Sequence, residues 1–170
     1  MITAAVLMLG GVGEAREWLV DKYGNGDFTD IQPAVEAAAD GDTIRIGPGR
    51  YDTLHPSCVA PAWTEDAIVT VVQDNLTFIG SGTDVTVLGM REYYWSNTED
   101  PKGICSIDGY SATIKDLTIE NIEQGIYWSR GRLDLENCII KGNHTSFRGI
   151  ISSADGGSIR SCRIEMGGGA

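Results

Sequence analysis

Hydrophobic and polar residues alternate with a period of two along most of the chain, and this pattern predicts many short β-strands. One segment near the N-terminus instead has the i, i+3, i+4, i+7 spacing of an amphipathic helix, in Ile31, Ala34, Val35 and Ala38. Thr29 or Asp30 can cap this helix and Gly41 ends it, so we expect a helix at about 30–39. Thr43–Ile46 then alternates like a half-buried strand.

The second half of the chain contains an internal repeat. The segments 103–124, 125–148 and 149–170 are 22, 24 and 22 residues long, and each begins with Gly-Ile. Aligned on the turn residues Asp116, Asn137 and Ser161, they share three apolar columns: Ile114/Leu135/Ile159, Leu117/Cys138/Cys162 and Ile119/Ile140/Ile164. The period within each repeat is two, broken by a polar turn, so each repeat is predicted to hold about three short strands.

Repeats of this length without helical periodicity predict an all-β fold, a parallel β-solenoid in which each repeat is one coil and like residues stack. Stacking would place Cys138 above Cys162. We expect free thiols there, because free cysteine packs as a small hydrophobe, and a disulfide is the alternative.

The segment upstream of the repeats is less regular. Asn75–Gly80 is expected to share the turn-then-strand phase of the repeats, and Val85–Leu88 supplies another strand. The stretches 54–63 and 90–102 are rich in proline or polar residues and are predicted to be irregular loops. Regular coils then occupy 103–170.

Composition narrows the class of protein. The 22 glycines against 5 prolines indicate many tight turns, and the net charge of −11 argues against a nucleic-acid partner. Residues 1–15 resemble a secretory signal that lacks its basic start; a start codon inside a longer signal, or a buried apolar arm, is the alternative. No later segment is apolar enough to span a membrane. At this length one domain is the default, so 16–170 is expected to form a single exported domain.

The sequence contains few residues in patterns that bind metals or cofactors. The four cysteines form no C-x-x-C pair and only His55 and His144 accompany them, so a zinc site is not expected. No cofactor is evident. Calcium is compatible with pairs of acidic side chains, although no D-x-D-x-D loop is present.

Four motifs resemble the N-terminal portion of the pectate-lyase-like superfamily of right-handed parallel β-helix proteins: Gly26–Gln32, the helix running to Gly41–Ile44, Pro48–Tyr51 and Asn75–Gly80, followed by the Gly-Ile coils. The resemblance covers roughly positions 20–170. It implies a right-handed parallel β-helix whose N-terminal end is capped by the helix. It carries over no catalytic residue, because the methylesterase, polygalacturonase and lyase motifs do not occur in the sequence.

Candidate ligand-binding residues are aromatic or basic. Tyr93, Tyr94 and Trp95 cluster in the second loop, where their rings could stack on sugars or instead fold back onto the solenoid. Alternation after Gly-Ile places Tyr127 on the outer surface, where it lines a groove or is a plain surface residue, and Trp128 inside. Arg148 could neutralise a uronate or abstract a proton in lyase-like chemistry, and surface solvation is the alternative.

Other polar residues give weaker signals. Asp134 and Glu136 lie two apart on one strand face, which is compatible with the carboxyl separation of glycoside hydrolases but also common on acidic surfaces. Arg130 could serve lyase-like chemistry or be solvated, and His144 lies in a turn with no nucleophile in the neighbouring sequence.

These features predict an extracellular or cell-surface protein that binds or acts on a polysaccharide or cell-surface glycan. Uronic-acid polymers are the first substrates to test, by lyase or glycoside hydrolase chemistry, and the catalytic residues are unknown. The alternative is a non-catalytic surface, adhesive or structural solenoid. The next Gly-Ile coil is due after Gly167–Gly169, so we expect a truncated chain whose open coil self-associates; a loose Gly-rich terminus is the alternative.

Overall fold

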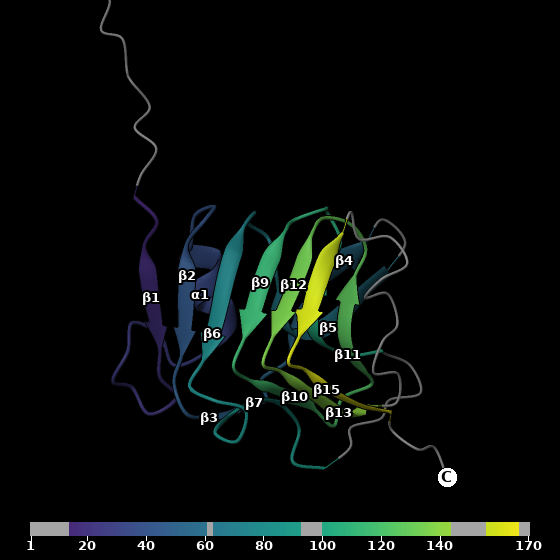
Figure 1. Cartoon of the computed structure of the whole chain (residues 1–170). Coiled ribbons are helices and arrows are strands. Elements are labelled where there is room, and N and C mark those ends of the chain that lie inside the picture. The colour runs from purple at the N-terminus through teal and green to yellow at the C-terminus, as the bar shows by residue number, and fades with distance from the viewer. Residues whose placement is uncertain (1–13, 61–62, 93–99, 144–155, 167–170) are drawn as a thin grey trace, which may run out of the picture.

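Three β-sheets and one short helix make up the described part of the protein (Figure 1). The structure is a computed structural model and describes residues 14–60, 63–92, 100–143 and 156–166. Neighbouring strands are parallel in every sheet, except that β4 and β5 are antiparallel. The expectation of an all-β chain with parallel sheets is confirmed.

The strands are distributed over sheets A, B and C. Sheet A contains, in spatial order, β1 Glu17–Val20, β2 Thr43–Ile46, β6 Leu76–Gly80, β9 Ala112–Lys115, β12 Leu133–Glu136 and β14 Gly157–Arg160. Sheet B contains β3 Gly49–Tyr51, β7 Thr86–Gly89, β10 Thr118–Glu120, β13 Ile139–Asn143 and β15 Arg163–Met166. Sheet C contains β4 His55–Ala60, β5 Trp63–Thr70, β8 Lys102–Ser106 and β11 Gln124–Trp128.

Successive strands enter the three sheets in rotation. After β6, β7 and β8 enter sheets A, B and C, β9, β10 and β11 repeat the order and lie beside them. The pairing aligns Ile114 with Leu135 and Leu135 with Ile159, which is the column that the repeat alignment predicts. The predicted stacking of the repeats is therefore confirmed at the level of single residues.

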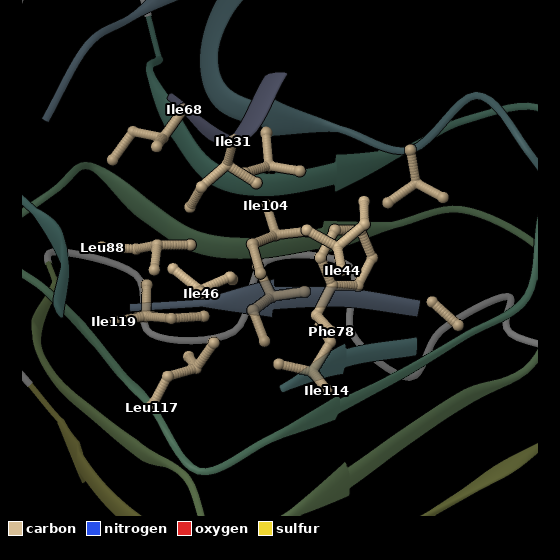
Figure 2. Packing of buried hydrophobic residues seen from close by; sticks show 14 of the residues in the cluster. Ile31, Ile44, Ile46, Ile68, Phe78, Leu88, Ile104, Ile114, Leu117 and Ile119 are labelled. Carbon is tan, nitrogen blue, oxygen red and sulfur yellow. The ribbon is translucent and has the colours of Figure 1, made fainter. Parts of the chain in front are cut away.

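The interior is filled by columns of identical or similar side chains. Ile44 pairs with Phe78 and Phe78 with Ile114, and all three are buried (Figure 2). Because each such side chain contributes about 1.5–3 kcal/mol on burial, these columns provide most of the apolar stabilisation of the sheets.

The helix α1, Ile31–Ala37, closes part of the core. Asp30 is its N-cap, with the side chain accepting a hydrogen bond from the Ile31 amide at 2.8 Å. Ile31, Ala34 and Val35 are fully buried in the same core as the strands, and Figure 2 shows Ile31 near Ile68. The predicted helix is confirmed, with a C-terminal end two residues earlier than expected.

The predicted loop at 54–63 is wrong over most of its length, because β4 occupies His55–Ala60. Pro56 lies in that strand, where proline is tolerated because β4 is the edge strand of sheet C and the pairing with β5 shifts register between His55 and Cys58. The middle of the predicted loop at 90–102 lies outside the described residues.

The predicted turn and strand at Asn75–Gly80 are confirmed, but the strand lies in a different sheet from the one that follows the repeat turn residues. Asn75 has a positive φ of 57°, but it precedes a strand of sheet A, since Leu76 pairs with Ala112. The repeat turn residue Asp116 instead follows a strand of sheet A. A polar residue before an apolar strand thus occurs both before strands of sheet A and before strands of sheet B. The sequence pattern alone does not show which of the two sheets the strand joins.

The turn column and the thiol column of the repeats are confirmed. Asp116, Asn137 and Ser161 have φ values of 57°, 50° and 53° between sheets A and B. Cys138 and Cys162 are free thiols, the Cys138 amide donates to Cys162 Sγ at 3.4 Å, and burial raises the pKa of Cys138 to about 12. Cys105, in contrast, is disulfide-bonded.

A candidate binding groove on the outer face of sheet B

One row of outward-facing residues crosses all five strands of sheet B. The register aligns, strand by strand, Arg50, Val87, Thr118, Ile139 and Arg163. Leu88, Ile119 and Ile140, which follow three of these residues, point into the core, so alternation turns the row outward. With neighbouring strands about 4.8 Å apart, Arg50 and Arg163 are separated by about 19 Å along the row.

A hollow of about 230 Å³ lies over this row. It is lined by Arg50, Thr83, Asp84, Val87, Thr118, Glu120, Ile139, Lys141 and Arg163. The partly exposed aliphatic side chains of Val87 and Ile139 belong to its floor, and the buried Thr118 hydroxyl is held by a hydrogen bond to the Thr83 carbonyl at 2.7 Å. We call this hollow the sheet B groove.

Glu120 is the central charge of the sheet B groove. Arg50 Nη2 donates to its Oε1 at 2.5 Å, and Lys141 Nζ lies 3.2 Å from its Oε2. Burial alone would raise the pKa of Glu120, but the hydrogen bonds from Arg50 and Lys141 outweigh burial and lower the pKa below its ordinary value. Glu120 is therefore ionised at neutral pH and poorly suited to deliver or accept a proton.

The three cationic side chains of the groove differ in how firmly they are held and in how exposed they are. Arg50 is fixed, because its Nη1 also donates to the carbonyls of Gly89 and Met90 at 2.9 and 2.7 Å. Lys141 is half-buried beside Glu120, whereas Arg163 is exposed and pairs with Glu165 at 2.9 Å. Lys141 and Arg163 are thus the cations that an anionic ligand can reach from solvent.

Most of the residues predicted to bind ligand lie outside the described residues. This holds for Tyr93, Tyr94, Trp95 and Arg148, and also for His144. Tyr127 is described and lies half-buried on the outer face of sheet C opposite Cys105, whereas Trp128 is fully buried. The predicted outward orientation of Tyr127 and inward orientation of Trp128 are confirmed.

Tyr127 belongs to a compact cluster on the outer face of sheet C. Its ring packs with Ala67 and Cys105, and Lys102 Nζ lies 5.3 Å from the ring centroid. Lys102 is only 1% exposed and forms an ion pair with Glu65. These contacts bury the polar and aromatic groups together, so the cluster offers less open surface than the sheet B groove.

The acidic pair Asp134 and Glu136 is engaged in ion pairs on the outer face of sheet A. Arg132 donates to both oxygens of Asp134 at 2.6 and 3.0 Å, and Lys115 lies 2.8 Å from Glu136. These hydrogen bonds lower the pKa of both carboxyls. A glycosidase needs one carboxyl with a raised pKa, and neither of these two provides it.

No group of three or more His, Cys, Asp or Glu side chains within the described residues is placed to hold a metal ion. None of the helices in the described part of the chain is long and apolar enough to cross a membrane.

The groove residues Arg50, Glu120, Lys141 and Arg163 were not among the sequence candidates. The repeat alignment nevertheless contains the signal for Glu120, Lys141 and Arg163. Each of them neighbours a residue of the apolar column Ile119/Ile140/Ile164 and must therefore face outward. Arg50 precedes the repeats and could not be placed in this way.

Comparisons of the chain with known protein families and with curated proteins find no match.

Proposed function

We propose that the three sheets are the faces of a right-handed parallel β-helix, and that the protein binds an acidic polysaccharide along the sheet B groove. The observation that carries this proposal is the row from Arg50 to Arg163, which places cations at both ends of a floor of aliphatic and hydroxyl groups. A polymer lying across the strands would follow this row.

The chemistry of the groove fits a uronic-acid polymer better than a neutral one. Guanidinium and ammonium groups form strong charge-assisted hydrogen bonds with carboxylates, and Arg163 and Lys141 are accessible for such bonds. Sugar ring faces are partly apolar and suit the side chains of Val87 and Ile139. The chain has a net charge of −11, which repels an acidic polymer. The accessible cations of the groove offset this repulsion locally.

A location outside the cytosol is part of the proposal. Disulfides persist in oxidising compartments and are rare in the cytosol, and Cys105 is disulfide-bonded. The signal-like segment at 1–15 points in the same direction, and extracellular or cell-surface glycans are the polymers met there.

Replacing Arg163 with serine should weaken binding of polygalacturonate about tenfold, because losing one charged hydrogen bond costs about 1.5 kcal/mol or more. The matched control is Arg160→Ser, which removes an exposed arginine of the same repeat from sheet A. Isothermal titration with polygalacturonate and with a neutral glucan measures both effects. Equal losses in the two variants, or equally tight binding of the neutral glucan, would contradict the proposal.

We expect bound polymer to stay intact. Glu120 is the most buried carboxylate of the groove, and the hydrogen bonds from Arg50 and Lys141 lower its pKa, which makes it a poor general acid and a weak general base. Incubation with polygalacturonate should therefore produce neither new reducing ends nor the ultraviolet absorbance of unsaturated sugars. Either product would show lyase or hydrolase chemistry and would replace the binding role with a catalytic one.

A further inference from the structure

The two ends of the sheet stack differ in how they are finished. At one end, the edge of β1 is covered by the chain itself, since the amides of Asp27 and Phe28 donate to the Leu19 carbonyl at 2.7 and 3.2 Å. Trp18 is packed there against the Phe28 ring at 5.6 Å and under the Arg16 guanidinium at 3.5 Å. Within the described residues, the β1 edge of sheet A is thus partly covered by the segment that follows it.

The opposite end exposes positions that are buried elsewhere. β14 and β15 are edge strands, and neither has a second neighbour among the described strands (Figure 1). Ile159 and Ile164 are 42% and 38% exposed, whereas Leu135 and Ile140, one repeat earlier in the same columns, are almost fully buried. The apolar columns therefore reach the surface next to an unpaired strand edge.

We infer that this end binds a second copy of the chain, with β15 of each copy pairing antiparallel around a two-fold axis at Ile164. In that register, Ile164 lies opposite Ile164 of the other copy on the core side. Arg163 lies opposite Glu165 of the other copy on the outer side, and Glu165 opposite Arg163. The sequence Arg-Ile-Glu is thus complementary to itself.

The neighbouring registers are disfavoured by the same three residues. Moving the axis to Arg163 or to Glu165 places like charges directly opposite each other, which is destabilising. A half-step shift brings Arg163 opposite Ile164 and breaks the separation of core and outer faces. Pairing around a two-fold axis uses the β15 edge of both copies at once, so this contact closes at a dimer.

The Arg163–Glu165 ion pair within each chain does not compete strongly with this pairing. Both side chains are exposed, and exposed ion pairs contribute little to stability. In the dimer each group has a partner in the opposite strand as well, while Ile164 is removed from water. Apolar burial thus provides affinity, and the charges select the register.

Charge reversal tests this interface without removing apolar surface. Sedimentation equilibrium of the chain over a concentration series should show a monomer–dimer equilibrium. Arg163→Glu and Glu165→Arg should each raise the dimer dissociation constant at least roughly tenfold, because each creates like-charge pairs. The double variant R163E/E165R should restore dimerisation, and Arg45→Glu, an exposed reversal at the far end of sheet A, should leave it unchanged.

Four results would overturn the inference. The first is a chain that stays monomeric at all concentrations, and the second is oligomers that grow beyond a dimer. The third is that the single reversals dimerise as tightly as the unmodified chain. The fourth is that the double variant fails to recover dimerisation although its circular dichroism spectrum is unchanged. Recovery in the double variant cannot be explained by misfolding of the single ones.

Discussion

Replacing Gly89 with alanine is expected to unfold the protein under conditions in which the Gly82→Ala variant remains folded. Gly89 pairs with Glu120 between β7 and β10, and a Cβ atom there would lie 1.7 Å from the Glu120 carbonyl oxygen. A side-chain movement cannot relieve this contact, because the atom that the new Cβ meets belongs to the backbone. The two strands would have to separate.

Gly82 provides a matched control because its φ angle is almost the same as that of Gly89. Its φ is 135° against 136° for Gly89, but the nearest atom to its Cβ would be Val85 Cγ2 at 3.6 Å, an ordinary contact. Gly82→Ala therefore measures the cost of the conformation alone, about 1–3 kcal/mol. Gly89→Ala adds to this the cost of separating two strands, and we expect the free energy of unfolding to fall by more than about 4 kcal/mol.

Urea unfolding followed by circular dichroism measures the two losses. Equal destabilisation of the two variants would show that close stacking of β7 on β10 is not what requires glycine at position 89. Because Arg50 donates to the Gly89 carbonyl, the same separation would also displace the fixed cation of the sheet B groove.

The stacking of repeats could be predicted from sequence because alternation and repeat length act together. Once Ile119, Ile140 and Ile164 are aligned, period two decides which of their neighbours face outward, and the pairing of β10, β13 and β15 agrees. The same logic separated Tyr127 from Trp128. Local patterns suffice here because each repeat contacts only its neighbours.

The remaining features depend on pairs that no local pattern connects. Arg50 and Glu120 are 70 residues apart and meet only because β3 and β10 lie on either side of β7. Pro56 reads as a loop signal, yet it is accommodated in a strand because that strand is at an edge. Lys102 reads as a surface residue, yet its pairing with Glu65 allows it to be buried.

Arg163 has a place in both proposals, and Glu165→Arg separates them. That variant keeps every cation of the sheet B groove but places arginine opposite arginine in the proposed dimer. Retained polygalacturonate binding by a monomeric Glu165→Arg chain would show that the groove works within one copy. The two proposals can therefore fail independently.

Replacing Asp42 with asparagine is expected to cost about 3 kcal/mol although the two side chains have the same shape. Asp42 is 4% exposed and accepts three hydrogen bonds, from the Arg16 amide at 2.7 Å, the Ala39 amide at 2.9 Å and Trp18 Nε1 at 2.9 Å. It thereby joins β1 to the end of α1 and to β2. All three partners are donors, so the NH₂ group of asparagine would face at least one of them without an acceptor.

The pH dependence of stability gives this prediction a second readout. Burial alone would raise the pKa of Asp42, but the hydrogen bonds from Ala39, Arg16 and Trp18 outweigh it and hold the pKa below the ordinary value of 3.8. A carboxyl with a lowered pKa stabilises the folded state above its ordinary pKa, and this contribution is lost as the pH falls through the lower, folded value. The stability gap between the unmodified chain and Asp42→Asn should therefore be constant from about pH 8 to 5 and narrow below 3.8.

The control is Asp108→Asn, which changes an exposed carboxylate in the turn after β8. It should alter the free energy of unfolding by less than about 0.5 kcal/mol at neutral pH. Urea titrations of the three proteins across this pH range measure both effects. A gap for Asp42→Asn as small as that of the control, or one that widens in acid, would mean that the three donors do not hold an ionised carboxylate. The junction of β1, α1 and β2 would then depend on the apolar contacts of Trp18, Phe28 and Ile31 alone.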